Sequence, residues 1–207
     1  MIPARTYRKF YLLAAAALLF GGTAIAQSHA GGASSTSSQQ PGVQTPDGNA
    51  PNPQSMNDRD FVKKALEGGD AEVQLGQLAQ QKSQSDDVKQ FAQKMVQDHT
   101  QMGDQLMKPL AKQLGVDPPK NLSKKDKQLM AKLESLSGSQ FDNEYIRAMV
   151  KDHRQDLKDF KSEAETTQDP NVKQAVQQGE TIVSQHLQLI EQIAQSHNVD
   201  SNGKPSM

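Results

Sequence analysis

The sequence predicts an all-α protein: a four-helix bundle with a short extra helix in the connection between its second and third long helices. Four long segments repeat apolar residues at the spacing that places them on one face of an α-helix. No segment shows the strict alternation of a half-buried β-strand. The first and second segments, and the third and fourth, are joined by only a few residues, so we expect two antiparallel hairpins.

The first long helix is expected over about residues 58–82, with Asn57 as its N-cap. Glu72 lies near its middle among small residues, close to the glycines at 68, 69 and 76. Two adjacent glycines inside a helix cost about 1 kcal/mol each relative to alanine. A close contact with another helix, or a local bulge beside Glu72, would explain why they are tolerated.

The second long helix is expected over residues 86–114, between an N-cap at Ser85 and a stop at Gly115. His99 occupies a core position on its apolar stripe. Pro109 has no backbone N–H and should bend the last turns.

The connection over residues 115–138 should contain a short helix, 124–136, capped by Ser123. The third long helix is expected over 140–165, with Ser139 as N-cap and His153 on its stripe. The fourth begins at the Asp-Pro pair at 169–170 and carries His186 on its stripe.

The second and third long helices repeat each other at an offset of 54 residues. Phe91-x3-Met95-Val96-x-Asp98-His99 matches Tyr145-x3-Met149-Val150-x-Asp152-His153. This repeat supports two related hairpins. The connection between them could run along the outside of the bundle or form a decorated turn, so the sequence leaves open whether these two helices are parallel or antiparallel.

Four polar residues fall near the four helix midpoints: Glu72, His99, His153 and His186. The midpoints lie near residues 70, 100, 152 and 183, and helix boundaries read from sequence carry an error of about 2–4 residues. A residue at a helix centre stays in the central layer whichever way the helix points. One glutamate and three histidines therefore form a candidate site for a single transition-metal ion: iron, copper, zinc or manganese.

The competing interpretation is a buried Glu–His hydrogen-bond network that only fixes helix register. Asp98 and Asp152 could orient neighbouring imidazole rings, or they could form exposed ion pairs such as Asp98 with Lys94. Two methionines could supply soft copper(I) ligands or simply fill the core: Met95 and Met149. His29 and His197 lie outside the stripes and receive no role.

The N-terminus predicts export. Residues 1–26 combine three basic residues, an apolar run too short to span a bilayer and an Ala-Ile-Ala cleavage site, as in a signal peptide. We expect a bacterial periplasmic or secreted protein, with an uncleaved anchor as the alternative and no membrane span after cleavage. Residues 27–56 and 198–207 are too polar to fold and predict a disordered linker and tail around a domain over 57–197.

Composition excludes several functions. The chain has no cysteine, so disulfides and lipidation at a cysteine are excluded. Loss of the signal lowers 23 basic residues to 20 against 24 acidic ones, a net charge of −4. No basic patch supports nucleic-acid binding. No nucleophile–base pair or phosphate-binding loop is present, so an enzyme is not favoured, and protein partners and oligomeric state stay open.

Residues 71–102 (AEVQLGQLAQQKSQSDDVKQFAQKMVQDHTQM), 141–160 (FDNEYIRAMVKDHRQDLKDF) and 183–190 (VSQHLQLI) resemble the DUF4142 family, a ferritin-like domain of unknown function. The resemblance covers residues 57–196 and implies a ferritin-like four-helix bundle in an exported bacterial protein, with no established activity. Ferritin-like di-iron proteins use Glu-x-x-His on two helices. Here valine stands three residues before each core histidine: Val96, Val150 and Val183. Ferroxidase chemistry is therefore not predicted.

Three hypotheses follow, in descending order. The first is an envelope protein that holds or senses a transition metal at the four-residue layer. The second is a structural or stress-related envelope protein, and the third is a metal-dependent oxidoreductase.

Overall fold

The computed structural model describes residues 53–200, with side chains from residue 57, and its regular elements are all helical. The predicted signal peptide, nearly all of the predicted linker and most of the tail lie outside the described residues. The elements are α1 (Pro53–Lys82), α2 (Asp86–Met102), the π-helical turn η1 (Gly103–Met107), α3 (Lys108–Leu114), α4 (Lys124–Ser135), α5 (Gly138–Thr166) and α6 (Pro170–Ser196). The predicted all-α fold with one short extra helix is confirmed.

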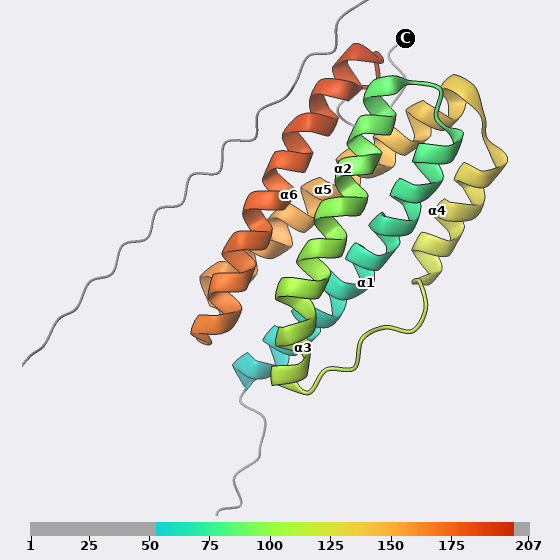
Figure 1. Ribbon diagram of the computed structural model, residues 1–207. Coiled ribbons are helices and arrows are strands. Elements are labelled where there is room, and N and C mark those ends of the chain that lie inside the picture. The colour runs from blue at the N-terminus through green and yellow to red at the C-terminus, as the bar shows by residue number, and fades with distance from the viewer. Residues whose placement is uncertain (1–52, 201–207) are drawn as a thin grey trace, which may run out of the picture. The chain divides into compact units, whose positions relative to one another are not determined.

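Two antiparallel hairpins, α1 with α2–α3 and α5 with α6, pack into a four-helix bundle (Figure 1). The connection after α3 returns along the outside of the bundle to the end where α2 began. Side-chain contacts fix both of its ends, because Arg59 Nη2 donates to Gly115 O at 3.0 Å and Lys82 Nζ donates to Leu133 O at 3.2 Å. The long connection therefore makes α2 and α5 run parallel, which settles the alternative that the sequence left open.

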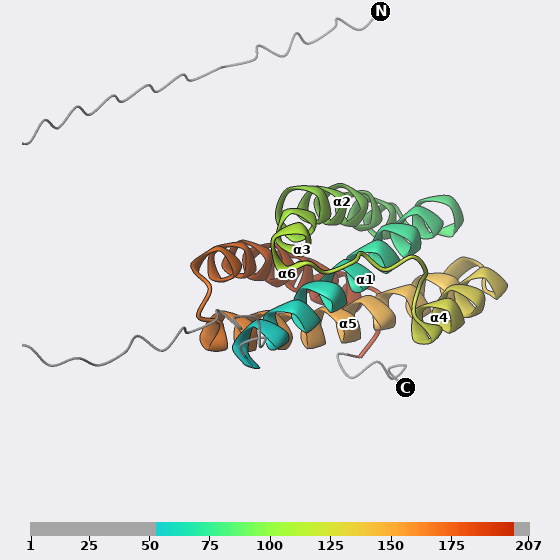
Figure 2. The same cartoon turned by 90° about the horizontal axis from the view of Figure 1, so that it is seen from below.

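The returning connection carries α4, which packs beside α1 and α5 (Figure 2). Its N-cap is the predicted one, since the Ser123 hydroxyl accepts the backbone N–H of Asp126 at 3.1 Å. Leu133 is fully buried and anchors the helix to the core. This helix forms one wall of the groove described below.

The second long helix is interrupted just before Pro109, close to the place where the sequence predicted a bend. The turn before this proline widens into η1, where Lys108 N–H bonds the carbonyl of Gly103, five residues back. Pro109 has no N–H to donate and its ring crowds the preceding turn, which favours such a local rearrangement. The structure therefore places the bulge here, whereas α1 is continuous α-helix beside Glu72.

Helix boundaries otherwise agree with the sequence to within a few residues. The predicted N-cap Asn57 is wrong, because α1 begins at Pro53, about one turn before the expected start near residue 58. The predicted N-cap Ser139 is also wrong, since Ser137 holds that position in α5. Asp169 caps α6 as predicted, accepting the backbone N–H of Asn171 at 2.8 Å.

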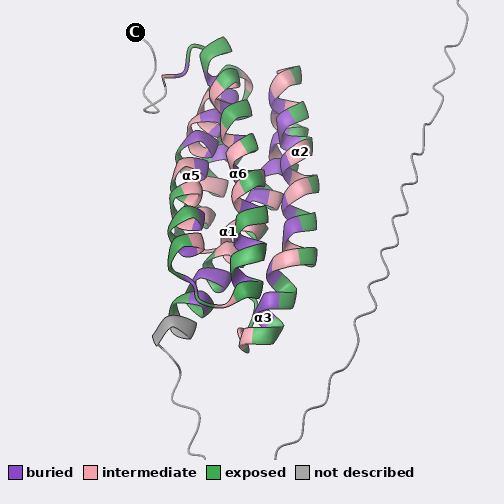
Figure 3. Cartoon of the chain, turned by 90° about the vertical axis from the view of Figure 1, so that its left-hand side faces the viewer, coloured by how far each residue is buried: buried purple, intermediate pink, exposed green. Residues whose placement is uncertain are grey.

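Buried residues line the inward faces of the helices (Figure 3) and form two hydrophobic clusters, one in each half of the bundle. The upper cluster, at the α1–α2 loop end, includes Leu75, Met95, Phe141, Tyr145, Met149 and Ile190. The lower cluster includes Phe61, Leu66, Met102, Phe160, Val176 and Val183. Along every long helix, the member of the Glu–His layer lies between the residues of these two clusters.

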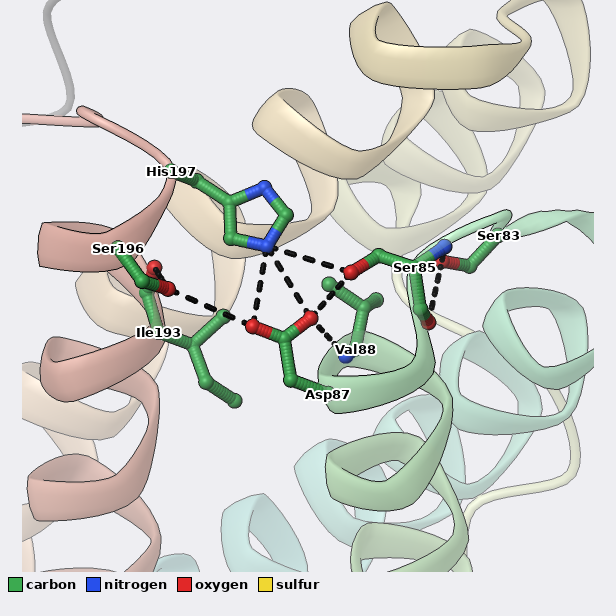
Figure 4. Close-up of polar contacts among 7 residues, drawn as sticks. All are labelled: Ser83, Ser85, Asp87, Val88, Ile193, Ser196 and His197. Carbon is green, nitrogen blue, oxygen red and sulfur yellow. Dashed lines mark hydrogen bonds and ion pairs between the residues drawn. The ribbon is translucent and has the colours of Figure 1, made fainter.

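At the upper end, His197 ties the end of α6 to the start of α2 (Figure 4). Its Nε2 lies 3.1 Å from both carboxylate oxygens of Asp87 and 3.4 Å from Ser85 Oγ. Because a single nitrogen faces both the serine and the aspartate, this cluster is not the relay of a catalytic triad. His197, to which the sequence assigned no role, is a structural link between helix ends.

A buried carboxyl pair lies at the lower end of the bundle. Asp58 of α1 and Glu163 of α5 are 3% and 7% exposed and share a hydrogen bond. Burial, and then Asp58, raise the pKa of Glu163 to about 7. Glu163 therefore keeps its proton in mildly acidic solution and loses it near neutrality.

Candidate metal centre

The structure brings all four predicted site residues into one layer across the middle of the bundle. Glu72 comes from α1, His99 from α2, His153 from α5 and His186 from α6. Their exposed fractions are 5%, 3%, 0% and 0%, respectively. Each occupies a position on an apolar stripe, and helical periodicity therefore directs each of them into the core.

The three imidazole rings surround one point. Their centroids are 5.2 Å (His99–His186), 5.5 Å (His153–His186) and 5.9 Å (His99–His153) apart. One nitrogen of each ring lies within 4.8 Å of a nitrogen of each of the others, the arrangement of a potential metal site formed by the three histidines without Glu72. Glu72 reaches two of the rings, with Oε2 3.0 Å from His99 Nδ1 and Oε1 3.5 Å from His153 Nδ1.

Two of the rings are held in place by hydrogen bonds on their outer nitrogens. His153 Nδ1 donates to the carbonyl of Met149 at 3.0 Å. His186 Nε2 donates to Asp98 Oδ2 at 2.8 Å, and the same oxygen accepts from Lys94 Nζ at 2.7 Å. These acceptors leave His153 Nε2 and His186 Nδ1 with unprotonated lone pairs, as in metal-bound histidines whose other nitrogen is hydrogen-bonded.

The sequence offered two interpretations of Asp98, and both are confirmed. Its carboxylate orients a ring and also forms the ion pair with Lys94. Asp152, at the matching position of the repeat, does not orient a ring. Its carboxylate accepts from Lys125 Nζ of α4 at 2.6 Å. The two halves of the repeat thus diverge because α4 covers only the second one.

The layer is not a complete hydrogen-bond network. Among the described residues, no hydrogen-bond partner exists for His153 Nε2, His186 Nδ1, either nitrogen of His99, or Glu72 Oε1. His99 Nδ1 is close to Glu72 Oε2, but the contact is not aligned for a hydrogen bond. An unpaired buried polar group costs about 1–3 kcal/mol. A layer built only to fix register would leave fewer such groups.

Burial keeps the rings neutral. It lowers the pKa of His99 well below its usual range, helped by the neighbouring His153 and His186. Burial, and then His186, lower the pKa of His153 to about 3. The pKa of His186 is also lowered by burial, although Asp98 opposes this. All three imidazoles are thus neutral at pH 7, the form that binds metals.

Glu72 has the opposite shift. Burial raises its pKa well above the usual range, and Asp156, Asp152 and Asp126 add to the rise. A cation in the layer would reverse this effect by favouring the ionised carboxylate. The acidic surroundings of Glu72 therefore suit a positively charged occupant of the layer.

Two aromatic residues flank the layer on its upper side. The edges of Phe91 lie against His153 and His186, with ring centroids 6.3 and 6.2 Å apart. Tyr145 is completely buried, and its hydroxyl has no partner among the described residues. Burial, and then Glu72, raise its pKa. The sequence analysis did not single out Tyr145 as a site residue. The repeat does carry a signal, because Tyr145 stands at the position of Phe91 and adds a hydroxyl there.

Met95 and Met149 belong to the upper hydrophobic cluster, and both are fully buried. This placement is that of ordinary core residues. Copper(I) ligation by their sulfurs stays a prediction.

The chain belongs to the DUF4142 family, a domain of unknown function whose model matches residues 43–193. Among solved structures it is similar to a DUF305 fragment from Deinococcus radiodurans, with a TM-score of 0.59 at 18% identity over 70% of this chain and 97% of that one. It is also similar to a DUF305 protein from Streptomyces coelicolor, described as a candidate secreted protein, with a TM-score of 0.59 at 14% identity over 69% and 92%. These likenesses show the shared helical fold. No curated protein matches the chain.

None of the helices in the described part of the chain is long and apolar enough to cross a membrane.

Proposed function

We propose that this protein is an exported, non-enzymatic member of its family that holds one transition-metal ion in the bundle core. His99, His153 and His186 supply nitrogen ligands, and Glu72 supplies a carboxylate oxygen. One nitrogen per ring and one oxygen make the four-ligand set that suits zinc, and it is also accepted by iron, copper and manganese. Export rests on the N-terminal sequence and agrees with the secreted description of the Streptomyces neighbour.

The observation that carries the proposal is the set of free nitrogens in a fully buried layer. Two of these rings are already oriented from outside, by Met149 O and Asp98. Metal–nitrogen bonds of about 2.0–2.1 Å place tetrahedral ligands about 3.4 Å apart. One nitrogen of each ring lies within 4.8 Å of one nitrogen of each of the others, so for these atoms to share a metal each ring needs to move inward by at most about 0.8 Å. Side-chain rotation accommodates such a shift without moving the helices.

The test combines elemental analysis with thermal melts of protein that has been exported by means of its own signal peptide. We expect close to one equivalent of metal, and a melting temperature that falls with chelator and recovers when the metal is restored. His99→Leu keeps a similar volume in the core and should abolish binding while the protein still folds. The proposal is refuted if the isolated protein holds no metal and its melting temperature does not change on adding zinc, iron, copper or manganese. The layer would then be a structural hydrogen-bond network.

A further inference from the structure

A surface groove lies between α1, α5 and the start of α4, directly beside the Glu–His layer. Its volume is about 230 Å³. Exposed Gln155 and Lys125 line its outer part, and buried Glu72 lines its floor. The groove therefore joins solvent to one member of the layer.

A second, smaller cavity continues inward from the same place. It measures about 30 Å³, enough for roughly one water molecule, and is lined by both Glu72 and His99. The groove and the cavity have four lining residues in common: Lys64, Gly68, Glu72 and Asp156. Glu72 thus faces the groove on one side and the histidines on the other. Its Oε1 has no hydrogen-bond partner among the described residues, although the side chain is only 7% exposed.

The groove is acidic. Five acidic side chains line it against two lysines: Glu67, Glu72, Asp126, Asp152 and Asp156 against Lys64 and Lys125. Burial raises the pKa of Asp156 to about 7 and that of Glu72 well above its usual range, so an approaching cation would favour the ionised form of both. Both lysines form ion pairs, Lys64 with Asp159 and Lys125 with Asp152, each at 2.6 Å. Their side chains are 63% and 65% exposed, so they can swing away at little cost. A groove with an excess of acidic side chains attracts cations and repels anions.

The adjacent glycines of α1 keep the passage open. A Cβ on Gly68 would meet no atom within 4 Å, and one on Gly69 would come within 3.9 Å of His99 Nδ1 only. Close helix packing therefore explains neither glycine. It does explain Gly76, whose Cβ would lie 2.9 Å from Val96 Cγ2 and 3.1 Å from Ala92 O. Both glycines weaken the helix, but they leave open the space beside it.

We propose that hydrated divalent cations reach the buried layer through this groove, and that Glu72 passes them from the groove to the histidines. The inference rests on the proposed function, because it describes how the same site is filled. Asp156 attracts the cation at the inner end of the groove. Glu72 replaces part of its hydration shell with one oxygen before the imidazole nitrogens complete the coordination.

The test measures the kinetics of Co²⁺ uptake by the metal-stripped full-length protein, followed by stopped-flow absorption of the histidine-bound ion. Gly68→Leu should slow both uptake and chelator-driven release at least tenfold and leave Kd within twofold of wild type. The leucine side chain would obstruct the groove without altering the metal ligands. Gln74→Leu places the same side chain on the exposed surface of α1 outside the groove. It should behave as wild type.

A second variant tests the charge. Asp156→Asn should lower the uptake rate and flatten its dependence on ionic strength. Asp104→Asn, which removes an exposed carboxylate elsewhere, should not. Uptake by Gly68→Leu and Asp156→Asn at the wild-type rate would overturn the route while leaving the metal site intact. Failure of wild-type protein to bind Co²⁺ or any other metal would instead remove the proposed function itself.

Discussion

Asp98→Asn is the sharpest test of how the layer is organised. The carboxylate is 20% exposed and accepts from His186 Nε2 at 2.8 Å and from Lys94 Nζ at 2.7 Å. Burial raises its pKa, but the hydrogen bonds from Lys94 and His186 outweigh this and hold the pKa below its usual range. At pH 7 the ring therefore donates to an ionised group, which fixes the tautomer with Nδ1 free.

Asparagine keeps the shape and one acceptor oxygen but removes the charge. A hydrogen bond to an ionised acceptor is about twice as strong as a neutral one. Loss of such a partner to a metal-bound histidine typically lowers metal affinity 10–100-fold, or about 1.4–2.7 kcal/mol. We expect this loss for Asp98→Asn, since His186 becomes both less basic and less constrained.

The assay is a competition titration at pH 7 between the protein and a chelator of known Zn²⁺ affinity. Asp104→Asn is the matched control, because among the described residues that carboxylate forms its ion pair with exposed Lys108, at 2.5 Å. A melt of the metal-free proteins separates affinity from folding. An affinity of Asp98→Asn within twofold of wild type would show that His186 does not bind metal through Nδ1.

Three further outcomes test other parts of the structure. In the metal-free protein, His99→Leu should raise the free energy of unfolding by about 1–2 kcal/mol, because it removes two unpartnered ring nitrogens from the core; a chemical denaturation curve without metal decides, and destabilisation would favour a structural role. The raised pKa of Glu163, about 7, means that the contribution of this residue to stability is fully present below about pH 4.5 and is lost as pH rises through 7. Glu163→Gln should remove this part of the pH dependence and add up to about 3 kcal/mol at pH 8, as measured by denaturation across pH; an unchanged pH profile would contradict the raised pKa of Glu163. Gly68→Ala should stabilise the protein by up to about 1 kcal/mol, whereas Gly76→Ala should destabilise it by about 1–3 kcal/mol, because only the second Cβ meets another helix; equal melting temperatures would refute this contrast.

Much of this architecture could be predicted from the sequence because it depends on local periodicity. The four apolar stripes determined four long helices, and the short loops determined two hairpins. The Glu–His layer could be placed before its distances were known, since a residue at a helix centre keeps its depth whichever way the helix runs. The caps at Ser123 and Asp169 were equally local, because each depends on only three or four residues.

Features that depend on contacts between distant residues needed the tertiary structure. The parallel course of α2 and α5 follows from a connection tied down at Arg59 and Lys82, which nothing in its own sequence specifies. The η1 turn, the link through His197 and the buried hydroxyl of Tyr145 likewise depend on neighbours far along the chain.

The site shows the same division. The sequence by itself determined which four residues share a layer, because depth along a helix is a property of one element. Only the tertiary structure decided which ring nitrogens are occupied, that Asp98 orients a ring while Asp152 faces α4, and that a groove reaches Glu72 past two glycines. The physical reason is that hydrogen-bond direction and empty space depend on the rotation and separation of packed helices, which are set by side chains far apart in the sequence.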